Sequence, residues 1–297
     1  MRLSDTPGRR RRYPDGVMRN APAARRALTV AAALLLGISY GPASSAQTHD
    51  PQLGICANGD AQSRVSACSQ LLARTGLDRA TTIAAYINRG NAHDAADQFD
   101  LALKDYQSAL DLDSDNWPAL RSRAGSYYRR GQLAAAVKDL SQAVTAMPDD
   151  VSPLRLRAQL YAEMGQTARA IEDFSKVLDR NPGDLQARQA RGLALASTGD
   201  HARAILDFNR VLERDPRVRV ARAARAFSLF RTREYRLAIL DWDQLLKDDP
   251  AQPQIIYCRG AAKLLAGDET GRVDIETVTQ QRPDVAAAES AACPIPR

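Results

Sequence analysis

Small and apolar residues recur along this chain with a fixed period of 34 positions from residue 83 onward. In each period a small residue is followed twelve positions later by alanine, and four positions after that by a large apolar side chain. The three columns are Gly90, Ala124, Ala158, Gly192, Ala226 and Gly260; Ala102, Ala136, Ala170, Ala204 and Ala238; and Tyr106, Leu140, Phe174, Phe208 and Trp242. Residues four apart share one face of a helix, and small residues allow two helices to cross closely. Each period therefore predicts a pair of antiparallel helices.

Helix-ending residues occupy two further columns. Glycine, which adopts left-handed backbone readily, is expected to end the first helix of a unit at Gly131, Gly165, Gly199 and Gly267. Proline is expected to end the second helix at Pro148, Pro182, Pro216 and Pro250. Each unit is then a helix of about 13 residues, a short turn and a second helix of similar length. The expected array covers residues 83–282, with regular units 83–116, 117–150, 151–184, 185–218 and 219–252 and a degraded unit from residue 253.

A single hairpin cannot bury its apolar face, whereas stacked hairpins bury a continuous core. The predicted fold is therefore all-α, an α-α superhelical solenoid of stacked helix-turn-helix hairpins. Three residues depart from the columns. Asp97 and Arg233 stand where glycine is expected, and Arg272 stands where alanine is expected. The second helix of the sixth unit is consequently expected to be imperfect or frayed.

One arginine and one aspartate recur in every regular unit, sixteen residues apart. The pairs are Arg89/Asp105, Arg123/Asp139, Arg157/Asp173, Arg191/Asp207 and Arg225/Asp241, and Arg259 continues the arginine column. A charged stripe of this kind suits a polyanion or an acidic peptide. However, every arginine has its own carboxylate at a fixed separation. We therefore interpret the column as a ladder of structural salt bridges, either within a hairpin or between adjacent units.

Two cysteines lie near each end of the array. Residues 47–82 are expected to form a leader in which Asp60 caps a helix reaching about Arg74, and residues 283–297 a C-terminal tail. Of three possible pairings we favour Cys56–Cys68 and Cys258–Cys293, because each pair lies at one end; free buried thiols are the alternative. A bridge between Cys258 and Cys293 would tether the tail over the C-terminal half of the array, where the first helices carry apolar and aromatic residues such as Phe227 and Phe230.

Residues 1–46 account for the whole net charge of +6, because they hold eight arginines and two aspartates. The remaining 33 basic and 33 acidic residues cancel, which removes the electrostatic basis for nucleic-acid binding. Arg25 and Arg26 precede an apolar run and small residues ending at Ala46, the layout of a cleaved secretory signal. We expect a signal peptide at 1–46, with Met18 as an alternative start. The mature protein is then periplasmic or secreted and has no stable membrane span.

Taken together, the columns resemble the tetratricopeptide repeat family over about residues 83–270, as in the segment from Ala102 to Ala109. With the leader that contains Cys56 and Cys68, the layout looks like that of exported repeat proteins of alphaproteobacteria. The resemblance implies that the first helices of the units line a concave groove that receives a peptide segment. Carried over by position, it implies eight peptide-binding residues: Asn91, Arg121, Tyr128, Arg129, Arg155, Gln159, Phe227 and Phe230.

Three of these residues, Arg121, Arg129 and Arg155, have no matching carboxylate in the ladder. They are expected to be free to meet an acidic peptide, with ordinary solvated charge as the alternative. Phe227 and Phe230 are expected either in the groove, in the core or beneath the tail.

The sequence contains no recognisable constellation for catalysis or for metal or cofactor binding. Hydrolase, zinc-protease and phosphate-loop motifs are absent, and the histidines are scattered, with His93 and His201 expected at the surface. We therefore expect no enzyme activity, no metal and no cofactor. The expected function is a scaffold or adaptor in the cell envelope that binds protein or peptide segments. The alternatives are a structural or self-associating repeat protein, a non-catalytic subunit of an envelope biogenesis complex, and an enzyme with an unrecognised site.

Overall fold

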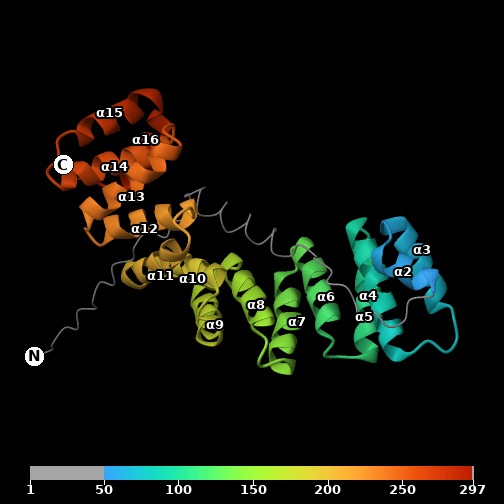
Figure 1. Ribbon diagram of the computed structural model, residues 1–297. Helices are drawn as coiled ribbons and strands as arrows, with labels where there is room; N and C mark the ends of the chain where they lie inside the picture. The colour runs from blue at the N-terminus through green and yellow to red at the C-terminus, as the bar shows by residue number, and fades with distance from the viewer. Residues whose placement is uncertain (1–49, 296–297) are drawn as a thin grey trace, which may run out of the picture. The chain divides into compact units, whose positions relative to one another are not determined.

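The computed structural model describes residues 50–295, and all regular secondary structure in this range is α-helical (Figure 1). The first eight helices are α2 (Pro51–Asn58), α3 (Ala61–Leu72), α4 (Arg79–Ala95), α5 (Phe99–Leu112), α6 (Trp117–Arg129), α7 (Leu133–Ala146), α8 (Val151–Glu163) and α9 (Thr167–Arg180). The following helices are α10 (Leu185–Ser197), α11 (His201–Arg214), α12 (Arg219–Arg231), α13 (Tyr235–Asp248), α14 (Pro253–Leu265), α15 (Gly271–Gln281) and α16 (Pro283–Ala292). The predicted all-α fold of helical hairpins is confirmed. The signal peptide expected at 1–46 lies outside the described residues.

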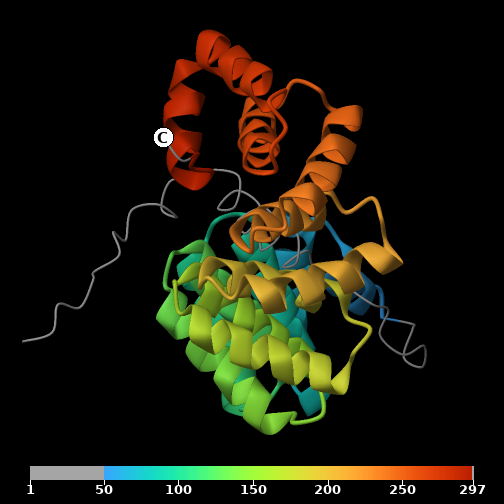
Figure 2. The same ribbon diagram turned by 90° about the vertical axis from the view of Figure 1, so that its left-hand side faces the viewer.

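The described chain divides into two compact units, which are treated separately. The N-terminal unit comprises residues 50–194, and the C-terminal unit comprises residues 195–295. In the N-terminal unit each helix from α2 to α9 packs against the next, and in the C-terminal unit the same holds from α11 to α16 (Figures 1 and 2). Within residues 50–295 no helix is both long and apolar enough to cross a bilayer.

The small columns of the sequence lie where helices cross. The alanines of the second helices have no exposed surface: Ala102, Ala136, Ala170, Ala204 and Ala238. At Gly90, a β-carbon would lie 2.6 Å from the ring of the fully buried Tyr106. Glycine at this position therefore makes room for the aromatic ring of the facing helix.

Helix ends follow local side-chain chemistry. Asp60, Asp78, Asn116 and Asp150 accept hydrogen bonds from backbone N–H groups in the first turns of α3, α4, α6 and α8. The turn glycines Gly131, Gly165, Gly199 and Gly267 have φ angles of 71, 71, 86 and 85°. The second helices α7, α9, α11 and α13 each end two residues before the proline of their unit. Glycine and proline therefore end the helices as their positions in the sequence predict.

Two turns place a residue with a side chain in the left-handed conformation that glycine adopts elsewhere. Asp97 has φ 57° and Arg233 has φ 67°. A left-handed residue with a β-carbon costs about 1–2 kcal/mol, and aspartate tolerates this conformation better than arginine. We expect Arg233→Gly to raise the free energy of unfolding by about 0.5–1 kcal/mol and Asp97→Gly by less. Thermal denaturation measures both changes. The reverse substitution, Gly165→Arg, is the control and should lower the melting temperature. If Arg233→Gly instead lowers the melting temperature, the left-handed backbone at Arg233 is not strained.

The sixth hairpin is more regular than expected. Its second helix, α15, is formed over Gly271–Gln281 and is not frayed, although its 11 residues make it shorter than the 14-residue second helices of the regular units. The small position follows the turn glycine by four residues, Gly267 to Gly271, instead of five as in the other units, so Gly271 rather than Arg272 takes this position. A β-carbon at Gly271 would lie 2.3 Å from the carbonyl oxygen of Gly260. The shift by one residue thus keeps a small residue at the helix crossing.

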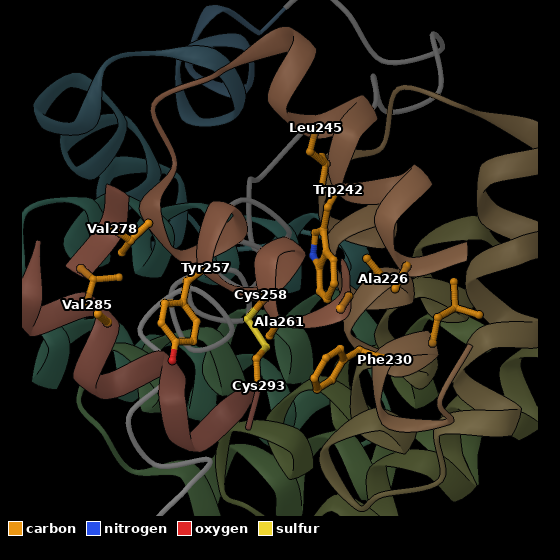
Figure 3. Packing of buried hydrophobic residues seen from close by; sticks show 14 residues of the cluster. Ala226, Phe230, Trp242, Leu245, Tyr257, Cys258, Ala261, Val278, Val285 and Cys293 are labelled. Atoms are coloured by element: carbon orange, nitrogen blue, oxygen red, sulfur yellow. A yellow bond between two sulfur atoms is a disulfide. The ribbon is translucent and has the colours of Figure 1, made fainter. Parts of the chain in front are cut away.

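The C-terminal segment after residue 282 forms helix α16, which was not predicted and which packs on α14 and α15. A disulfide joins Cys258 in α14 to Cys293, directly after α16 (Figure 3). The bridge lies in one hydrophobic cluster with side chains from five helices, among them Phe230, Trp242, Tyr257, Val278 and Val285. The tail is therefore part of the core of the C-terminal unit.

A second disulfide joins Cys56 in α2 to Cys68 in α3. Helix α3 begins after its cap Asp60 as the sequence predicts, whereas α2 was not predicted. Cys56, Cys68 and Leu71 are buried together with Ala85 of α4. The α2/α3 pair therefore covers the first helix of the first hairpin.

Candidate functional site

The ladder arginines lie between helices and hold their aspartates through two hydrogen bonds each. In Arg89, Arg123, Arg157 and Arg225 the Nε and Nη2 atoms donate to the two carboxylate oxygens of the aspartate sixteen residues later, at 2.6–2.9 Å. The aspartates Asp105, Asp139, Asp173, Asp207 and Asp241 are at most 4% exposed. The hydrogen bonds to Asp173 raise the pKa of Arg157 above its ordinary value. Burial of these carboxylates favours a structural role over ligand binding.

A sixth pair, which the sequence analysis missed, joins Arg259 to Asp274. Nε and Nη2 of Arg259 donate to the carboxylate oxygens at 2.8 and 2.7 Å. The separation is fifteen residues because the spacing from the turn glycine to the aspartate is seven residues in this unit (Gly267 to Asp274) and eight in the others, as from Gly131 to Asp139. Aligning the sixth unit with a one-residue gap would have revealed this pair.

Each ladder arginine also reaches the second helix of the preceding unit. The Nη1 atom donates to a polar side chain sixteen residues earlier, at 2.6–3.2 Å. The acceptors of Arg123, Arg157, Arg191, Arg225 and Arg259 are Gln107, Ser141, Ser175, Asn209 and Asp243. Arg89 makes the equivalent bond to Ser69 of α3 at 3.1 Å. The arginine column therefore connects neighbouring hairpins, and the carboxylate bonds of Arg89, Arg123, Arg157, Arg225 and Arg259 hold the two helices of their own hairpins together.

Two of the three arginines expected to be unmatched have carboxylate partners. Arg129 forms an ion pair with Asp94, donates to the carbonyl oxygen of Asp94 at 3.1 Å and lies over the Phe99 ring. Arg155 forms an ion pair with Asp184 at 3.1 Å. The expectation is wrong for these two residues because their partners lie outside the sixteen-residue column: Asp94 belongs to the preceding unit, and Asp184 is the last residue of the unit that contains Arg155.

Asn91 and Phe230 are not available to a peptide, which corrects their assignment to the groove. Asn91 is 5% exposed and accepts a hydrogen bond from the Tyr106 hydroxyl at 2.8 Å. Phe230 is 5% exposed and packs against Tyr235 and Trp242 in the core (Figure 3). Both side chains are held in the interior by partners from the second helix of their own hairpin.

Phe227 occupies an intermediate position in the C-terminal unit. Its ring is half-buried, has an edge contact with His201 and lies beneath the Arg231 guanidinium. Burial lowers the pKa of His201. His93 lies beside Gln98 and Asp105, and its side chain is only 13% exposed. The expectation that these histidines lie free at the surface is therefore wrong.

Three predicted peptide-binding residues do meet at one place in the N-terminal unit. Arg121 and Tyr128 of α6 and Gln159 of α8 line a shallow pocket. Its other lining residues are small or aliphatic: Ala124, Gly125, Leu140, Leu156 and Leu160. Among the described residues Arg121 has no ion-pair partner. The result is a pocket that combines an apolar surface with a free cation and two side chains that can form hydrogen bonds, and we call it the α6/α8 groove.

Tyr128 is oriented by a residue that sequence reasoning did not single out. Its hydroxyl donates to a carboxylate oxygen of Glu163, at the end of α8, at 3.1 Å. Burial raises the pKa of Tyr128 and also that of Glu163. Glu163 lies 35 residues after Tyr128, about one repeat, so comparing equivalent positions of adjacent units could have suggested the contact.

A metal site is not evident among the described residues. The single group of three adjacent metal-binding side chains in residues 50–295 is Cys258, Glu289 and Cys293. Both of its sulfur atoms are bonded to each other in the disulfide, so they offer no thiolate ligand.

Comparison with known proteins supports the repeat architecture. Family models described as tetratricopeptide repeat match residues 83–116 and 155–218. The comparison with curated proteins finds no match. A solved tetratricopeptide repeat protein from Parabacteroides merdae is 20% identical with a TM-score of 0.55, covering 82% of this chain and 96% of that chain.

Two further solved structures are similar over a shorter part of the chain. YrrB, described as a tetratricopeptide repeat protein with an unusual peptide-binding site, is 21% identical with a TM-score of 0.55 and coverage of 63% and 95%. MamA is 18% identical with a TM-score of 0.53 and coverage of 57% and 92%. At these identities the likeness concerns the fold. The family models identify tetratricopeptide repeats at residues 83–116 and 155–218, and the 34-residue period and the stacked hairpins continue the same repeat architecture between and beyond them.

Proposed function

We propose that the protein is an envelope scaffold that captures a peptide segment of a partner protein in the α6/α8 groove. A tetratricopeptide repeat fold supports protein–protein interaction in general, and such repeats typically act as scaffolds without catalysis. The observation that carries the specific proposal is the convergence of Arg121, Tyr128 and Gln159 around an apolar surface. The peptide-binding site that YrrB is described as having is consistent with a peptide ligand on this fold.

The groove suits a short segment with an aliphatic side chain followed or preceded by an acidic one. Leu156 is half-buried and offers apolar contact area to the aliphatic side chain, whereas Leu140 and Leu160 are buried and form the floor beneath it. Arg121 offers donors to a carboxylate, and Gln159 offers a donor and an acceptor to the peptide backbone. Because the other two arginines are committed to Asp94 and Asp184, Arg121 is the cation we assign to the ligand.

The proposed compartment is the periplasm or the exterior of the cell. Two observations support it: the two disulfides are of the kind that persists in oxidising compartments, and the sequence of residues 1–46 has the layout of a secretory signal. A structural repeat protein or a non-catalytic subunit of an envelope complex would use the same compartment and fold.

Site-specific photocrosslinking in intact cells tests the groove. A photoreactive residue replaces Tyr128 in one variant and Gln159 in another, and captured proteins are identified by mass spectrometry. We expect both positions to capture the same envelope protein, and Arg121→Glu to reduce this capture by at least about tenfold, because it places like charges together. The matched control carries the photoreactive residue at Glu172, an exposed position of α9. Capture of the same protein from position 172, or capture unaffected by Arg121→Glu, would refute a site in this groove.

A further inference from the structure

An exposed row of aliphatic side chains runs along the second helices of the C-terminal unit. Leu206 of α11, Leu240 of α13 and Val273 of α15 each precede the ladder aspartate of their hairpin, and each is 64% exposed. Leu237, one turn before Leu240 on α13, is 50% exposed. Figure 1 shows these three helices as the second helices of successive hairpins. We call Leu206, Leu237, Leu240 and Val273 the outer stripe.

The fold does not require aliphatic residues at these positions. In the N-terminal unit the residue before the ladder aspartate is charged in every hairpin: Lys104, Lys138 and Glu172. Exposed aliphatic side chains that recur on one face are typical of an interaction surface. The outer stripe is separate from the α6/α8 groove, which lies in the other unit.

The charges beside the stripe differ in sign between its two ends. On α11, Leu206 lies between Arg203 and Arg210, which are seven residues apart and therefore share one face of the helix. On α15, Val273 lies between Glu276 of the same helix and Glu269 in the turn directly before it. Three of these side chains form local ion pairs, Arg203–Asp200, Arg210–Glu213 and Arg272–Glu269. All are exposed contacts within one helix or its cap, so they stabilise little and can be exchanged.

We propose that the outer stripe pairs with the outer stripe of a second copy of this chain across a two-fold axis. A two-fold axis parallel to the helices and passing beside Leu240 reverses the order of the hairpins. It therefore sets Leu240 against Leu240, and Leu206 against Val273 of the other copy. The same two-fold rotation places the basic end on α11 of each copy against the acidic end on α15 of the other copy. This contact occurs twice in each dimer. A periodic stripe with opposite charges at its ends is self-complementary in this way, as an isologous interface requires.

The size of the surface sets the expected strength. Three helix faces, each about 20 Å long and about 10 Å wide, offer on the order of 600 Å² per copy. This is below the roughly 800 Å² per partner of standard stable complexes. The dimer is consequently weak, forms reversibly with rising protein concentration and weakens at high salt.

Sedimentation velocity of the full chain over a wide concentration range is the first test. Wild type should shift from monomer to dimer, and Leu240→Lys should raise the dissociation constant by at least about tenfold, because it buries two facing lysines. The matched control is Leu101→Lys, which changes an exposed leucine outside the stripe and should leave the dissociation constant unchanged. Circular dichroism checks that both variants are folded. A wild type that stays monomeric, or a dimer that Leu240→Lys does not weaken, would overturn the proposal.

A charge exchange tests the two-fold arrangement itself. The variant Arg203→Glu/Arg210→Glu makes both ends acidic, and the variant Glu269→Arg/Glu276→Arg makes both ends basic. Each should be monomeric alone, whereas an equal mixture should form a heterodimer, because every acidic end then meets a basic one. Failure of the mixture to associate, with wild type dimeric under the same conditions, would exclude the proposed pairing.

Discussion

Arg157→Ala is expected to lower the free energy of unfolding by about 3–5 kcal/mol, because it leaves a buried carboxylate without its cation. Arg157 donates two hydrogen bonds to Asp173, at 2.7 and 2.9 Å, and a third to Ser141 of the preceding hairpin at 3.1 Å. Asp173 is 3% exposed, so water cannot replace the lost donors. Denaturant unfolding of the full chain measures the loss. Below its melting temperature the variant should still capture its partner in the α6/α8 groove, so the crosslinking yield should fall little although the free energy of unfolding is reduced.

Two matched variants separate the buried pair from ordinary surface charge. Lys176→Ala removes an exposed ion pair with Glu172 on α9 and should change stability by no more than about 0.5 kcal/mol. Replacing Arg157 by methionine and Asp173 by leucine together should recover most of the stability, because the cost arises from the unpaired charge. An unchanged melting temperature for Arg157→Ala combined with loss of capture would instead mean that the ladder is a binding stripe.

Gly271→Ala is expected to destabilise the C-terminal unit by about 1–3 kcal/mol or more, because the added methyl group overpacks a helix crossing. The new β-carbon would lie 2.3 Å from the carbonyl oxygen of Gly260 and 2.9 Å from the β-carbon of Lys263. The first of these is a backbone atom, so α14 and α15 would have to move apart. The Arg259–Asp274 pair spans the same crossing, and its two hydrogen bonds would lengthen with it. In a Trp117→Phe background Trp242 is the one remaining tryptophan of the sequence, so thermal denaturation followed by tryptophan fluorescence reports on this unit.

The control for Gly271 is a helical glycine with free space around it. Gly54 in α2 has no atom within 4 Å of an added β-carbon, so Gly54→Ala should leave stability unchanged or raise it slightly. If Gly271→Ala melts at the wild-type temperature, the close contact between Gly260 and Gly271 does not set the distance between α14 and α15.

The ladder and the groove divide the charged residues of the repeats into two groups. The guanidinium groups of the ladder arginines donate hydrogen bonds within their own hairpin and to the preceding hairpin. These bonds fix how adjacent hairpins stack. Arg121, two residues before Arg123 in the same helix, makes no ion pair within the described residues. A rigid stack with a few free polar groups on an apolar surface is what a peptide-binding scaffold needs, because little ordering of the protein is then required on binding.

The structure also shows where positional reasoning failed. Asn91 and Phe230 were assigned to the groove by their place in the first helix, but Tyr106 and Trp242 of the second helices hold them in the interior. The ladder offers Arg129 and Arg155 no partner, but Asp94 of the preceding unit and Asp184 at the end of the unit of Arg155 lie within reach. The repeated columns predict which residues are large or charged, but they do not predict these particular contacts.

The sequence by itself determined those features of the protein that recur in every repeat unit. Helix lengths, turn positions and the sixteen-residue salt bridges depend on interactions within one 34-residue unit, and a pattern seen in five units shows them five times. Only the tertiary structure decided which side chains remain free. Contacts between particular residues of different helices decide that Arg121 is available to a ligand and Arg129 is not. They also decide that Gly271 allows the helices of the sixth hairpin to pack closely. Such contacts occur once in the chain, and one sequence contains no periodic signal for them.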